Sequence, residues 1–394
     1  MNIAINAMPI DAYGGLTYLQ EVLPRLDALE NGYRWFVYAR PATVAKLSFP
    51  ARRVVFRPVP FHLGRPGRLL IEQLWLPRLF EADGIDVVYT ATNVDLFLAR
   101  QPTVIEIRNL EPFLHQQFPN SFPQRWRCRV LAALSRLSLQ TATRIMCVSE
   151  FARDVALPPQ HPCRHKATVI PHGCDPARCE AAARPVGAPP RYLFTSGRMA
   201  GYANLLTLIE AYAICRQLGV TEPLVIAGGP HDAGYERRVL RQIHRLGLEP
   251  HVRRLGYVPH KEFLGWLRHS SLFVFPSLLE ACPNTLLEAM ACGQAIVASR
   301  TPAAVELAGE AAEWCSGTDA ASMAAAIVRV LREPGRLEWL RQRAKEQVRK
   351  FPWESSIQRL CELIESTKSM GRLGRPVPLL RESGQPSVAM QKQP

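Results

Sequence analysis

The chain has 394 residues, 47% of them hydrophobic, and a formal net charge of +14. This length and apolar content are enough for two domains with separate cores, and a single domain of this size would be unusual. No stretch approaches about 18 consecutive apolar residues, so we expect no membrane-spanning helix. The N-terminal MNIAINAMPIDAYGG lacks a basic start and an apolar core, which favours a first strand over a signal peptide.

The positive charge is concentrated in two segments. Residues 118–166 hold eight Lys or Arg against two Asp or Glu, net +6, and residues 367–394 hold five against one, net +4. Such clustering favours an anionic partner, either acidic lipid headgroups or nucleic acid. No nucleic-acid-binding motif accompanies the charge, so we expect an anionic membrane surface and no nucleic acid.

Ten cysteines are scattered along the chain without a C-x2-C pair. We therefore expect reduced thiols in a cytosolic protein, with neither a disulfide framework nor a zinc site.

Strand-like and helix-like segments alternate in the first half of the chain, which predicts a parallel sheet covered by helices and hence a Rossmann-like domain. Gly14 and Gly15 follow the first strand and precede a helix, where a glycine turn lets the backbone approach a phosphate or sugar. A Gly-Gly pair in isolation is equally typical of a tight turn. The predicted strands are NIAINAM, WFVYAR, VVFRPV, DVVYTA, PTVIEI and RIMCVS, and the predicted helices run through TYLQEVLPRL, through LLIEQLWLPRLF and from Gln124.

The helix from Gln124 has an apolar stripe and a basic face. Two interpretations stay open: the stripe belongs to the core and the arginines are solvated, or the helix rests on an anionic bilayer. The stripe consists of Trp126, Val130, Ala133, Leu134 and Leu137, and the basic face of Arg125, Arg129 and Arg136.

A linker is predicted at Glu180–Arg191, where EAAARPVGAPPR replaces periodic apolar residues with Ala, Pro and Gly. A second domain follows, with strands RYLFTSGR, PLVIAGG and VRRLGYV. His172, before the linker, is predicted to be a structural residue at a strand end.

The segment 272–299, LFVFPSLLEACPNTLLEAMACGQAIVAS, reads as strand, loop, helix and strand. The helix N-cap is either Asn284, or Cys282 with Pro283 at the first helical position. Both place free N–H groups between Glu280 and Glu288, which suits a ligand with sugar hydroxyls and a diphosphate. The alternative is that Glu280 is a solvated loop residue and Glu288 only complements the helix dipole.

The E-x7-E spacing of Glu280 and Glu288, inside PS-x2-E…LEAMACG, resembles the signature of the retaining glycosyltransferases of family 4. The resemblance implies the α/β GT-B fold, with two Rossmann-like parallel-sheet domains facing each other across a cleft. It implies an acceptor-side domain over 1–185, a nucleotide-sugar donor domain over 186–350, a closing helix over 351–366 that returns to the first domain, and a basic disordered tail over 367–394.

The resemblance also implies roles for individual residues. The catalytic residues would be Arg198 on the diphosphate and Glu280 on the donor sugar, while Glu288 would bind the ribose. The remaining donor-binding residues would be Gly14 and Gly15 in the glycine loop, Gly197 beside Arg198, Tyr257 and Val258 at the base, and Asn284, Thr285 and Leu286 through their N–H groups.

Two positions depart from the family pattern. Where many members have a His-Asp pair, this chain has Arg108 and Asn109, which leaves the acceptor or sugar contact open. Arg108 cannot be a base, so it either clamps a phosphate or carboxylate or forms a surface ion pair. The family's Lys, five residues after Arg198, is Ala203 here. Losing one such cation typically costs about 3 to 4 kcal/mol, or a rate factor on the order of 10² to 10³.

The resemblance implies transfer of a sugar from a nucleotide diphosphate donor to an acceptor hydroxyl with retention. It requires neither a cofactor nor a metal, because the leaving phosphate takes the acceptor's proton. The expected acceptor is a lipid-linked glycan of a cell-surface polysaccharide or lipopolysaccharide, and the expected location is the cytoplasmic face of the cell membrane. The alternatives are a non-catalytic nucleotide-sugar-binding partner subunit and a GT-B nucleotide-sugar epimerase.

Overall fold

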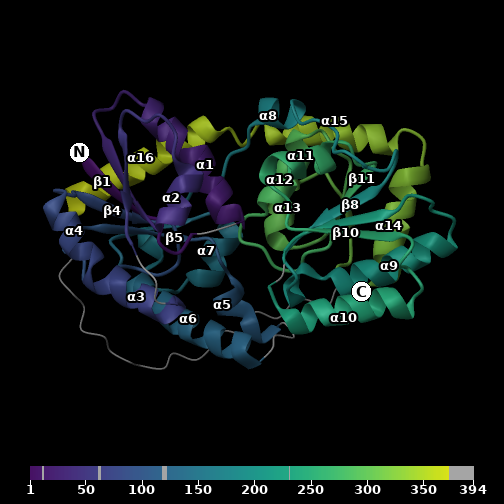
Figure 1. The fold of residues 1–394 in the computed structure, drawn as a ribbon, viewed down its shortest axis with the longest axis horizontal. Helices are drawn as coiled ribbons and strands as arrows, with labels where there is room; N and C mark the ends of the chain where they lie inside the picture. Colours follow the sequence, from purple (N-terminus) through teal and green to yellow (C-terminus); the bar gives the residue numbers. More distant parts are fainter. Residues whose placement is uncertain (11–12, 61–63, 118–121, 230, 372–394) are drawn as a thin grey trace.

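The protein contains two parallel sheets with helices packed around each of them (Figure 1). The computed structural model describes residues 1–10, 13–60, 64–117, 122–229 and 231–371. One sheet has seven strands and lies in the first half of the chain, and the other has six strands and lies in the second half. The predicted fold class, two Rossmann-like domains, is confirmed.

The N-terminal sheet has the strand order β3-β2-β1-β4-β5-β6-β7. β1 is an interior strand, where Ile5 pairs with Val37 on one side and with Tyr89 on the other. The strands are β1 (Asn2–Asn6), β2 (Arg34–Ala39), β3 (Val54–Pro58), β4 (Val87–Thr90), β5 (Thr103–Ile107), β6 (Arg144–Cys147) and β7 (Ala167–Val169).

Helices connect most of these parallel strands, whereas β4 and β5 are joined by residues 91–102 without a helix. The predicted helix through LLIEQLWLPRLF is two helices, because Pro77 lacks an N–H and its ring displaces the preceding turn, so α3 ends at Leu74. The helices are α1 (Tyr13–Ala28), α2 (Pro41–Leu47), α3 (Arg65–Leu74), α4 (Leu76–Ala82), α5 (Glu111–Leu114), α6 (Phe122–Thr141), α7 (Glu150–Ala156) and α8 (Pro176–Glu180), with short 3₁₀ helices η1 (His115–Gln117) and η2 (Arg164–Lys166).

The C-terminal sheet has the order β10-β9-β8-β11-β12-β13. Its strands are β8 (Leu193–Ser196), β9 (Leu224–Ala227), β10 (Val252–Gly256), β11 (Leu272–Phe275), β12 (Ile296–Ser299) and β13 (Glu313–Cys315). Its helices are η3 (Gly201–Ala203), α9 (Leu205–Gln217), α10 (Ala233–Arg245), α11 (His260–Arg268), α12 (Asn284–Ala291), α13 (Pro302–Ala308), α14 (Ala320–Arg332) and α15 (Arg336–Val348).

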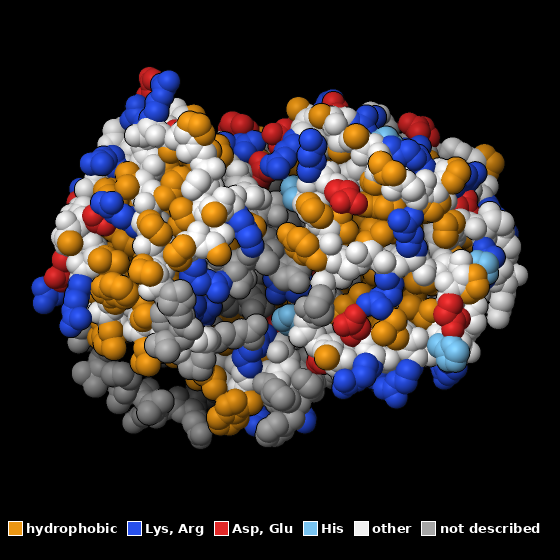
Figure 2. All heavy atoms as spheres, viewed as in Figure 1, with side chains coloured by type: hydrophobic (Ala, Val, Ile, Leu, Met, Phe, Trp, Pro, Cys, Tyr) orange, Lys and Arg blue, Asp and Glu red, His pale blue; other side chains and the backbone are white. Residues whose placement is uncertain are grey.

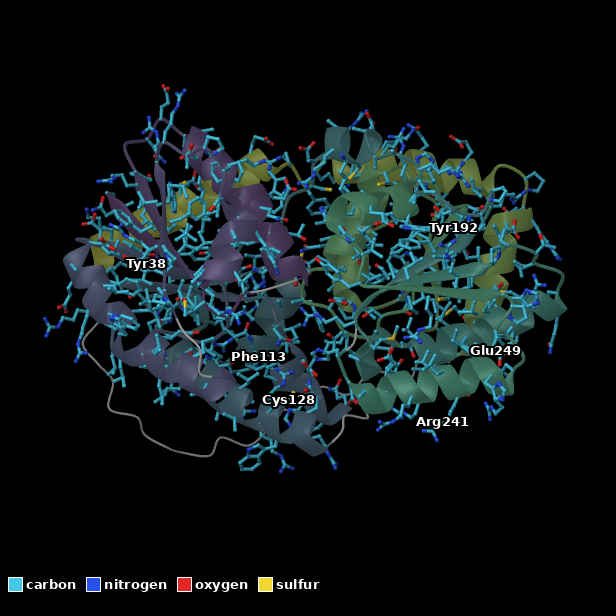
Figure 3. The ribbon with its side chains drawn as sticks, viewed as in Figure 1. Tyr38, Phe113, Cys128, Tyr192, Arg241 and Glu249 are labelled. Atoms are coloured by element: carbon cyan, nitrogen blue, oxygen red, sulfur yellow. The ribbon has the colours of Figure 1, made fainter. Side chains whose placement is uncertain are left out.

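The central strands are mostly apolar and buried because both faces of each sheet are covered. Every residue of β4, β9, β11 and β12 is buried. Tyr38 and Tyr192, one in each domain, are fully buried (Figure 3). In each sheet the strand order reverses beside a central strand, between β1 and β4 and between β8 and β11. Ligands of open α/β sheets bind beyond the strand ends at such points.

The last helix, α16 (Trp353–Met370), leaves the C-terminal domain and packs on the N-terminal one. Gly173 allows this crossing, because a Cβ there would lie 2.5 Å from the Cα of Trp353. The helix continues four residues past the predicted boundary at 366: Thr367 is fully buried, and Lys368 Nζ lies 3.1 Å from Asp86 Oδ1. The rest of the predicted tail, 372–394, lies outside the described residues.

Of the two interpretations of α6, the one that places the apolar stripe in the core is wrong. Trp126 and Val130 are 63% and 43% exposed, so they do not belong to the core. Mostly small residues are buried instead, and Ser138 is buried with its polar groups satisfied: its Oγ donates to Leu134 O at 2.7 Å and accepts from Asp95 N–H at 2.8 Å. The buried face consists of Cys128, Ala132, Ser135, Ser138 and Leu139.

Candidate active site between the two domains

The loop after β11 and the start of α12 bring the two predicted carboxylates to the gap between the domains. The predicted N-caps are both wrong, because Pro283 is the N-cap and Asn284 is the first helical residue. The Asn284 side chain does not cap the helix, since its Oδ1 lies 2.8 Å from His172 Nδ1 in the other domain.

The N-terminus of α12 offers fewer free N–H groups than predicted. Asn284 N–H donates to Cys282 O at 2.9 Å, and Leu286 N–H donates to Pro283 O at 2.9 Å. Of the three predicted donors, Thr285 alone has an N–H with no acceptor among the described residues. Of the three predicted N–H groups, the helix start therefore offers an anion only that of Thr285.

Glu280 lies half-buried in the loop before α12 and close to Arg198. Burial raises the pKa of Glu280 to about 7, although a hydrogen bond from Ser277 and the positive charge of Arg198 oppose that rise. Ser277 Oγ lies 3.1 Å from Glu280 Oε1. The two residues predicted to be catalytic are thus neighbours.

Arg198 follows β8 on a loop that a close backbone approach holds in place. Gly228, after β9, has a φ of 147°, and a Cβ there would lie 1.8 Å from Gly197 O. No other residue type fits this approach. Ala203 is buried beside the same loop, since a Cβ on Gly197 would lie 3.5 Å from the Ala203 Cβ. The position of the family's Lys therefore adjoins the predicted diphosphate site.

Tyr257 and Val258 follow β10 at the same edge of the sheet. Gly228 N–H donates to Gly256 O at 2.8 Å, which holds this loop against the one that follows β9. The Tyr257 side chain is 57% exposed, whereas Val258 packs against the C-terminal core.

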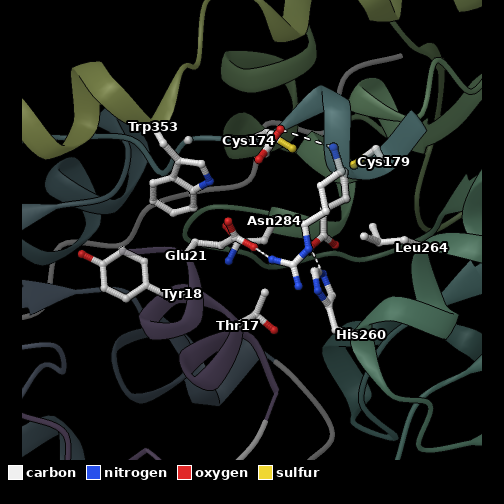
Figure 4. A pocket seen from close by; sticks show the side chains of 13 residues that line it. Thr17, Tyr18, Glu21, Cys174, Cys179, His260, Leu264, Asn284 and Trp353 are labelled. Carbon is white, nitrogen blue, oxygen red and sulfur yellow. Dashed lines mark hydrogen bonds and ion pairs between the residues drawn. The ribbon is translucent and has the colours of Figure 1, made fainter. Parts of the chain in front are cut away.

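Glu288 lines a crevice between the domains (Figure 4). His260 Nε2 lies 2.6 Å from Glu288 Oε1. Across the crevice, Arg178 pairs with Glu21 of α1. Thr17, Asn284 and Trp353 also line it.

Gly14 and Gly15 lie in the first turn of α1, not in a loop before it. A Cβ on Gly14 would lie 3.7 Å from Asn284 Nδ2, so the N-termini of α1 and α12 approach each other across the domain interface. Gly14 is exposed and has no side chain that would lie between the two helix N-termini.

Arg108 and Asn109, the pair that departs from the family pattern, have different environments. Arg108 Nη1 lies 3.6 Å from the buried Glu106, and its guanidinium lies over the Tyr18 ring at 4.7 Å, so this is not a surface ion pair. Asn109 Oδ1 accepts the N–H of Glu111 at 3.0 Å, and this bond orders the turn before α5. Arg108 is therefore held against Glu106 and Tyr18 of its own domain, whereas Asn109 stabilises its own loop.

Sequence reasoning missed a buried polar chain beneath this interface. The chain runs from Tyr89 through Glu106 and His172 to Asn284. Glu106 in the segment TVIEI could have revealed this chain in the sequence, because a charged residue in a buried strand needs a partner.

The first domain also contacts the loop before α12 directly. Ser149 Oγ donates to Ala281 O at 2.5 Å. The Glu306 carboxylate of α13 accepts the N–H groups of Glu150 and Phe151 at 2.7 and 3.1 Å, at the start of α7. These bonds hold the two domains together beside Glu280. Within the described ranges, no group of three or more His, Cys, Asp or Glu is placed to hold a metal ion.

Two parallel-sheet domains with a carboxylate-framed loop between them define a GT-B protein. Residues 13–178 match the model of the family "Glycosyltransferase Family 4", and residues 181–351 match that of the family "Glycosyl transferases group 1". This chain belongs to the family 4 glycosyltransferases, a class of enzymes with the GT-B fold.

Several individual proteins resemble this chain at low sequence identity. The O-antigen chain mannosyltransferase B of Escherichia coli is 28% identical over 166 residues, 42% of this chain and 43% of that protein. This chain matches less than half the length of the curated relatives. The sucrose-phosphate synthase of Thermosynechococcus elongatus has a TM-score of 0.72 at 18% identity, covering 94% and 100% of the two chains. Anabaena HepE in complex with UDP-glucose has a TM-score of 0.72 at 17% identity, covering 93% and 100%.

Proposed function

We propose that this chain moves a sugar from a nucleotide diphosphate donor to an acceptor hydroxyl, with retention. The observation that supports this most directly is the placement of two carboxylates on either side of the start of α12: Glu280, which feels the charge of Arg198, and Glu288, which lines the crevice. Carboxylates accept hydrogen bonds from sugar and ribose hydroxyls, and a guanidinium matches a phosphate. The similar fold of HepE holds UDP-glucose, which supports a nucleotide-sugar donor.

In the proposed reaction, the bond between the anomeric carbon and the leaving phosphate breaks while the acceptor oxygen bonds to the same face of that carbon. The acceptor's proton passes to the leaving phosphate oxygen. Arg198 and the Thr285 N–H would stabilise the charge that develops on the phosphate, and Glu280 would orient the sugar. One such contact is typically worth a rate factor on the order of 10² to 10³. No protein nucleophile, cofactor or metal ion takes part.

The acceptor would bind from the N-terminal domain, on the side of the crevice formed by α1. The name of the Escherichia coli relative, an O-antigen chain mannosyltransferase, supports a cell-surface polysaccharide or lipopolysaccharide glycan as the acceptor. An acceptor of this kind is carried on a lipid.

We further propose that the protein works on the anionic inner face of the cell membrane. None of the helices in the described ranges is long and apolar enough to cross a bilayer. The helices α6 and α10 lie along the lower edge in Figure 1, and Lys and Arg side chains line that edge over α10 in Figure 2. We call the exposed side chains of this edge the basic edge: Arg125, Trp126, Arg129, Val130 and Arg136 of α6, and Arg237, Leu240, Arg241 and Arg245 of α10. Arginines interleaved with apolar side chains suit anionic headgroups.

A panel of UDP-, GDP- and ADP-sugars tests the donor proposal, with thermal shift and donor hydrolysis scored together on the purified protein. We expect at least one nucleotide sugar to raise the melting temperature and to be hydrolysed slowly. Glu288→Ala should lose the shift, whereas Glu310→Ala, at an exposed position away from the crevice, should keep it. Failure of every donor to bind would overturn the proposal.

A non-catalytic nucleotide-sugar-binding subunit is the second candidate, because Ala203 places a methyl group where the family has a cation. Binding without hydrolysis or transfer, for every donor and lipid-linked acceptor tried, would favour it.

A further inference from the structure

A continuous chain of hydrogen bonds runs from the core of the N-terminal domain to the first residue of α12. Tyr18 Oη lies 2.8 Å from Tyr89 Oη, and Tyr89 Oη donates to Glu106 Oε2 at 2.5 Å. Glu106 Oε1 lies 3.0 Å from His172 Nε2, and His172 Nδ1 lies 2.8 Å from Asn284 Oδ1. All of these residues except Asn284 are more than nine-tenths buried.

The charge on Glu106 fixes one side of His172. Burial alone would raise the pKa of Glu106, but the charge of Arg108 and hydrogen bonds from His172 and Tyr89 lower it to about 2. Glu106 is therefore a carboxylate in the neutral pH range and accepts a hydrogen from His172 Nε2.

The other side of His172 fixes the Asn284 carboxamide. In the observed arrangement Asn284 presents its oxygen, so His172 Nδ1 must also carry a hydrogen for the 2.8 Å contact to be a hydrogen bond. The NH₂ group of Asn284 then points the other way, toward the open position beside Gly14. Asn284 lines the crevice next to Glu288, so this NH₂ group is available to a ligand.

We infer that Glu106 and His172 are positioning residues that hold the Asn284 NH₂ group toward the crevice, where it donates a hydrogen bond to the diphosphate of the nucleotide donor. The inference rests on the proposed function.

A double-mutant cycle tests whether the pair acts through Asn284. UDP, GDP and ADP are the probes, titrated by calorimetry into the full-length protein. Asn284→Ala should weaken the best-bound diphosphate by about tenfold or more, because a hydrogen bond to a charged group is lost. Glu106→Gln should weaken it by a similar factor, and Glu106→Gln combined with Asn284→Ala should be no weaker than Asn284→Ala alone. Additive losses would overturn the inference.

Ser149→Ala is the matched control, because Ser149 also makes a buried hydrogen bond across the domain interface but does not touch Asn284. Its effect on affinity should add to that of Asn284→Ala. If Glu106→Gln does not fold, Asn284→Asp replaces it in the test: an Asp keeps an oxygen toward His172 but places a second one toward the diphosphate. We expect it to lose more affinity than Asn284→Ala, and equal losses would contradict the inference.

Nitrogen NMR of the histidine rings separates this inference from the proposed function, because it needs no ligand. The His172 signals, assigned by their loss in His172→Gln, should show hydrogen on both ring nitrogens at neutral pH. In Asn284→Ala the Nδ1 signal should change most. A ring with a bare Nδ1 in the wild type would overturn the inference whether or not a donor binds. If no diphosphate binds the wild type, the proposed function fails and the NMR result still decides the positioning.

Discussion

His260 Nε2 lies 2.6 Å from Glu288 Oε1, so the carboxylate that resembles the family's ribose-binding residue has a partner before any ligand arrives. A carboxylate has two oxygens and about four acceptor positions, so this bond leaves room for both ribose hydroxyls. His260 holds the Glu288 side chain in one orientation, so less conformational entropy of that side chain is lost when a ligand binds.

Glu288→Ala should weaken the free nucleotide and the nucleotide sugar alike, because both have the ribose. The expected loss is about 1.5 to 3 kcal/mol, typical of hydrogen bonds to a charged group. Glu280→Ala should weaken the nucleotide sugar more than the free nucleotide. Calorimetry on both variants with both ligands checks this, and equal losses for the two ligands in the Glu280 variant would contradict its assignment to the sugar.

The contribution of Glu280 to sugar binding should depend on pH. Its pKa in the free protein is raised to about 7, so below that pH the group is protonated and offers fewer acceptors to sugar hydroxyls. If the bound form is the carboxylate, the preference for the nucleotide sugar over the free nucleotide should rise with pH from about 6 to about 8, by at most about tenfold per unit. Glu280→Gln cannot titrate, so its preference should be flat across this range.

Ala203→Lys separates the enzyme from the binding subunit. Ala203 is buried against Gly197, and Arg198 already lies beside the donor loop, so we expect an added lysine to change turnover little or to lower it through crowding. Single-turnover transfer by wild type, Arg198→Ala and Ala203→Lys checks this. An inactive wild type that gains activity with the lysine, within a factor on the order of 10² to 10³, would show that the site lacks its leaving-group stabiliser.

Glu306→Ala should loosen the two domains. Its carboxylate caps the start of α7 from the other domain, and losing a cap of this kind costs about 1 kcal/mol. We expect a lower melting temperature and a larger radius of gyration in solution scattering. Glu310→Ala, whose carboxylate lies 3.9 Å from an Arg343 nitrogen on an exposed surface, should change neither. Identical scattering from wild type and Glu306→Ala would rule out a clamp.

Reversing charge on the basic edge should reduce binding to anionic vesicles. We expect Arg125→Glu with Arg129→Glu to weaken sedimentation with vesicles, by up to about 1 kcal/mol for each basic residue removed, with the effect fading in high salt. Arg341→Glu with Arg343→Glu on α15, at the opposite edge in Figure 1, is the matched control. Equal losses in the two variants would show attraction by net charge alone.

The predicted tail gives a second test of membrane binding. The chain should be truncated after Gly371, because a truncation at Ser366 would remove the buried Thr367 and the Lys368 ion pair from α16. Equal vesicle binding by truncated and full-length protein at low salt would show that the tail is not an anchor.

The sequence predicted the parallel strands and the loop with Glu280 and Glu288, because apolar runs and helical periodicity are local signals. It did not predict which face of α6 is buried, because Cys, Ala and Ser pack there by their small size and not by hydrophobicity. It also missed the link between Glu106 and Asn284, since pairs so far apart in sequence depend on how the two domains meet. The N-cap of α12 was predicted wrongly for the same reason: the Asn284 side chain is held by a residue of the other domain.

The path of α16 has a consequence for biosynthesis. Its apolar face, with Trp353, Ile357, Leu360 and Ile364, completes the core around β1. At typical rates of translation, on the order of ten to forty seconds pass between synthesis of the last strand of the first sheet and synthesis of this helix. Until the helix has left the ribosome, the nascent first domain exposes the apolar surface that α16 later covers.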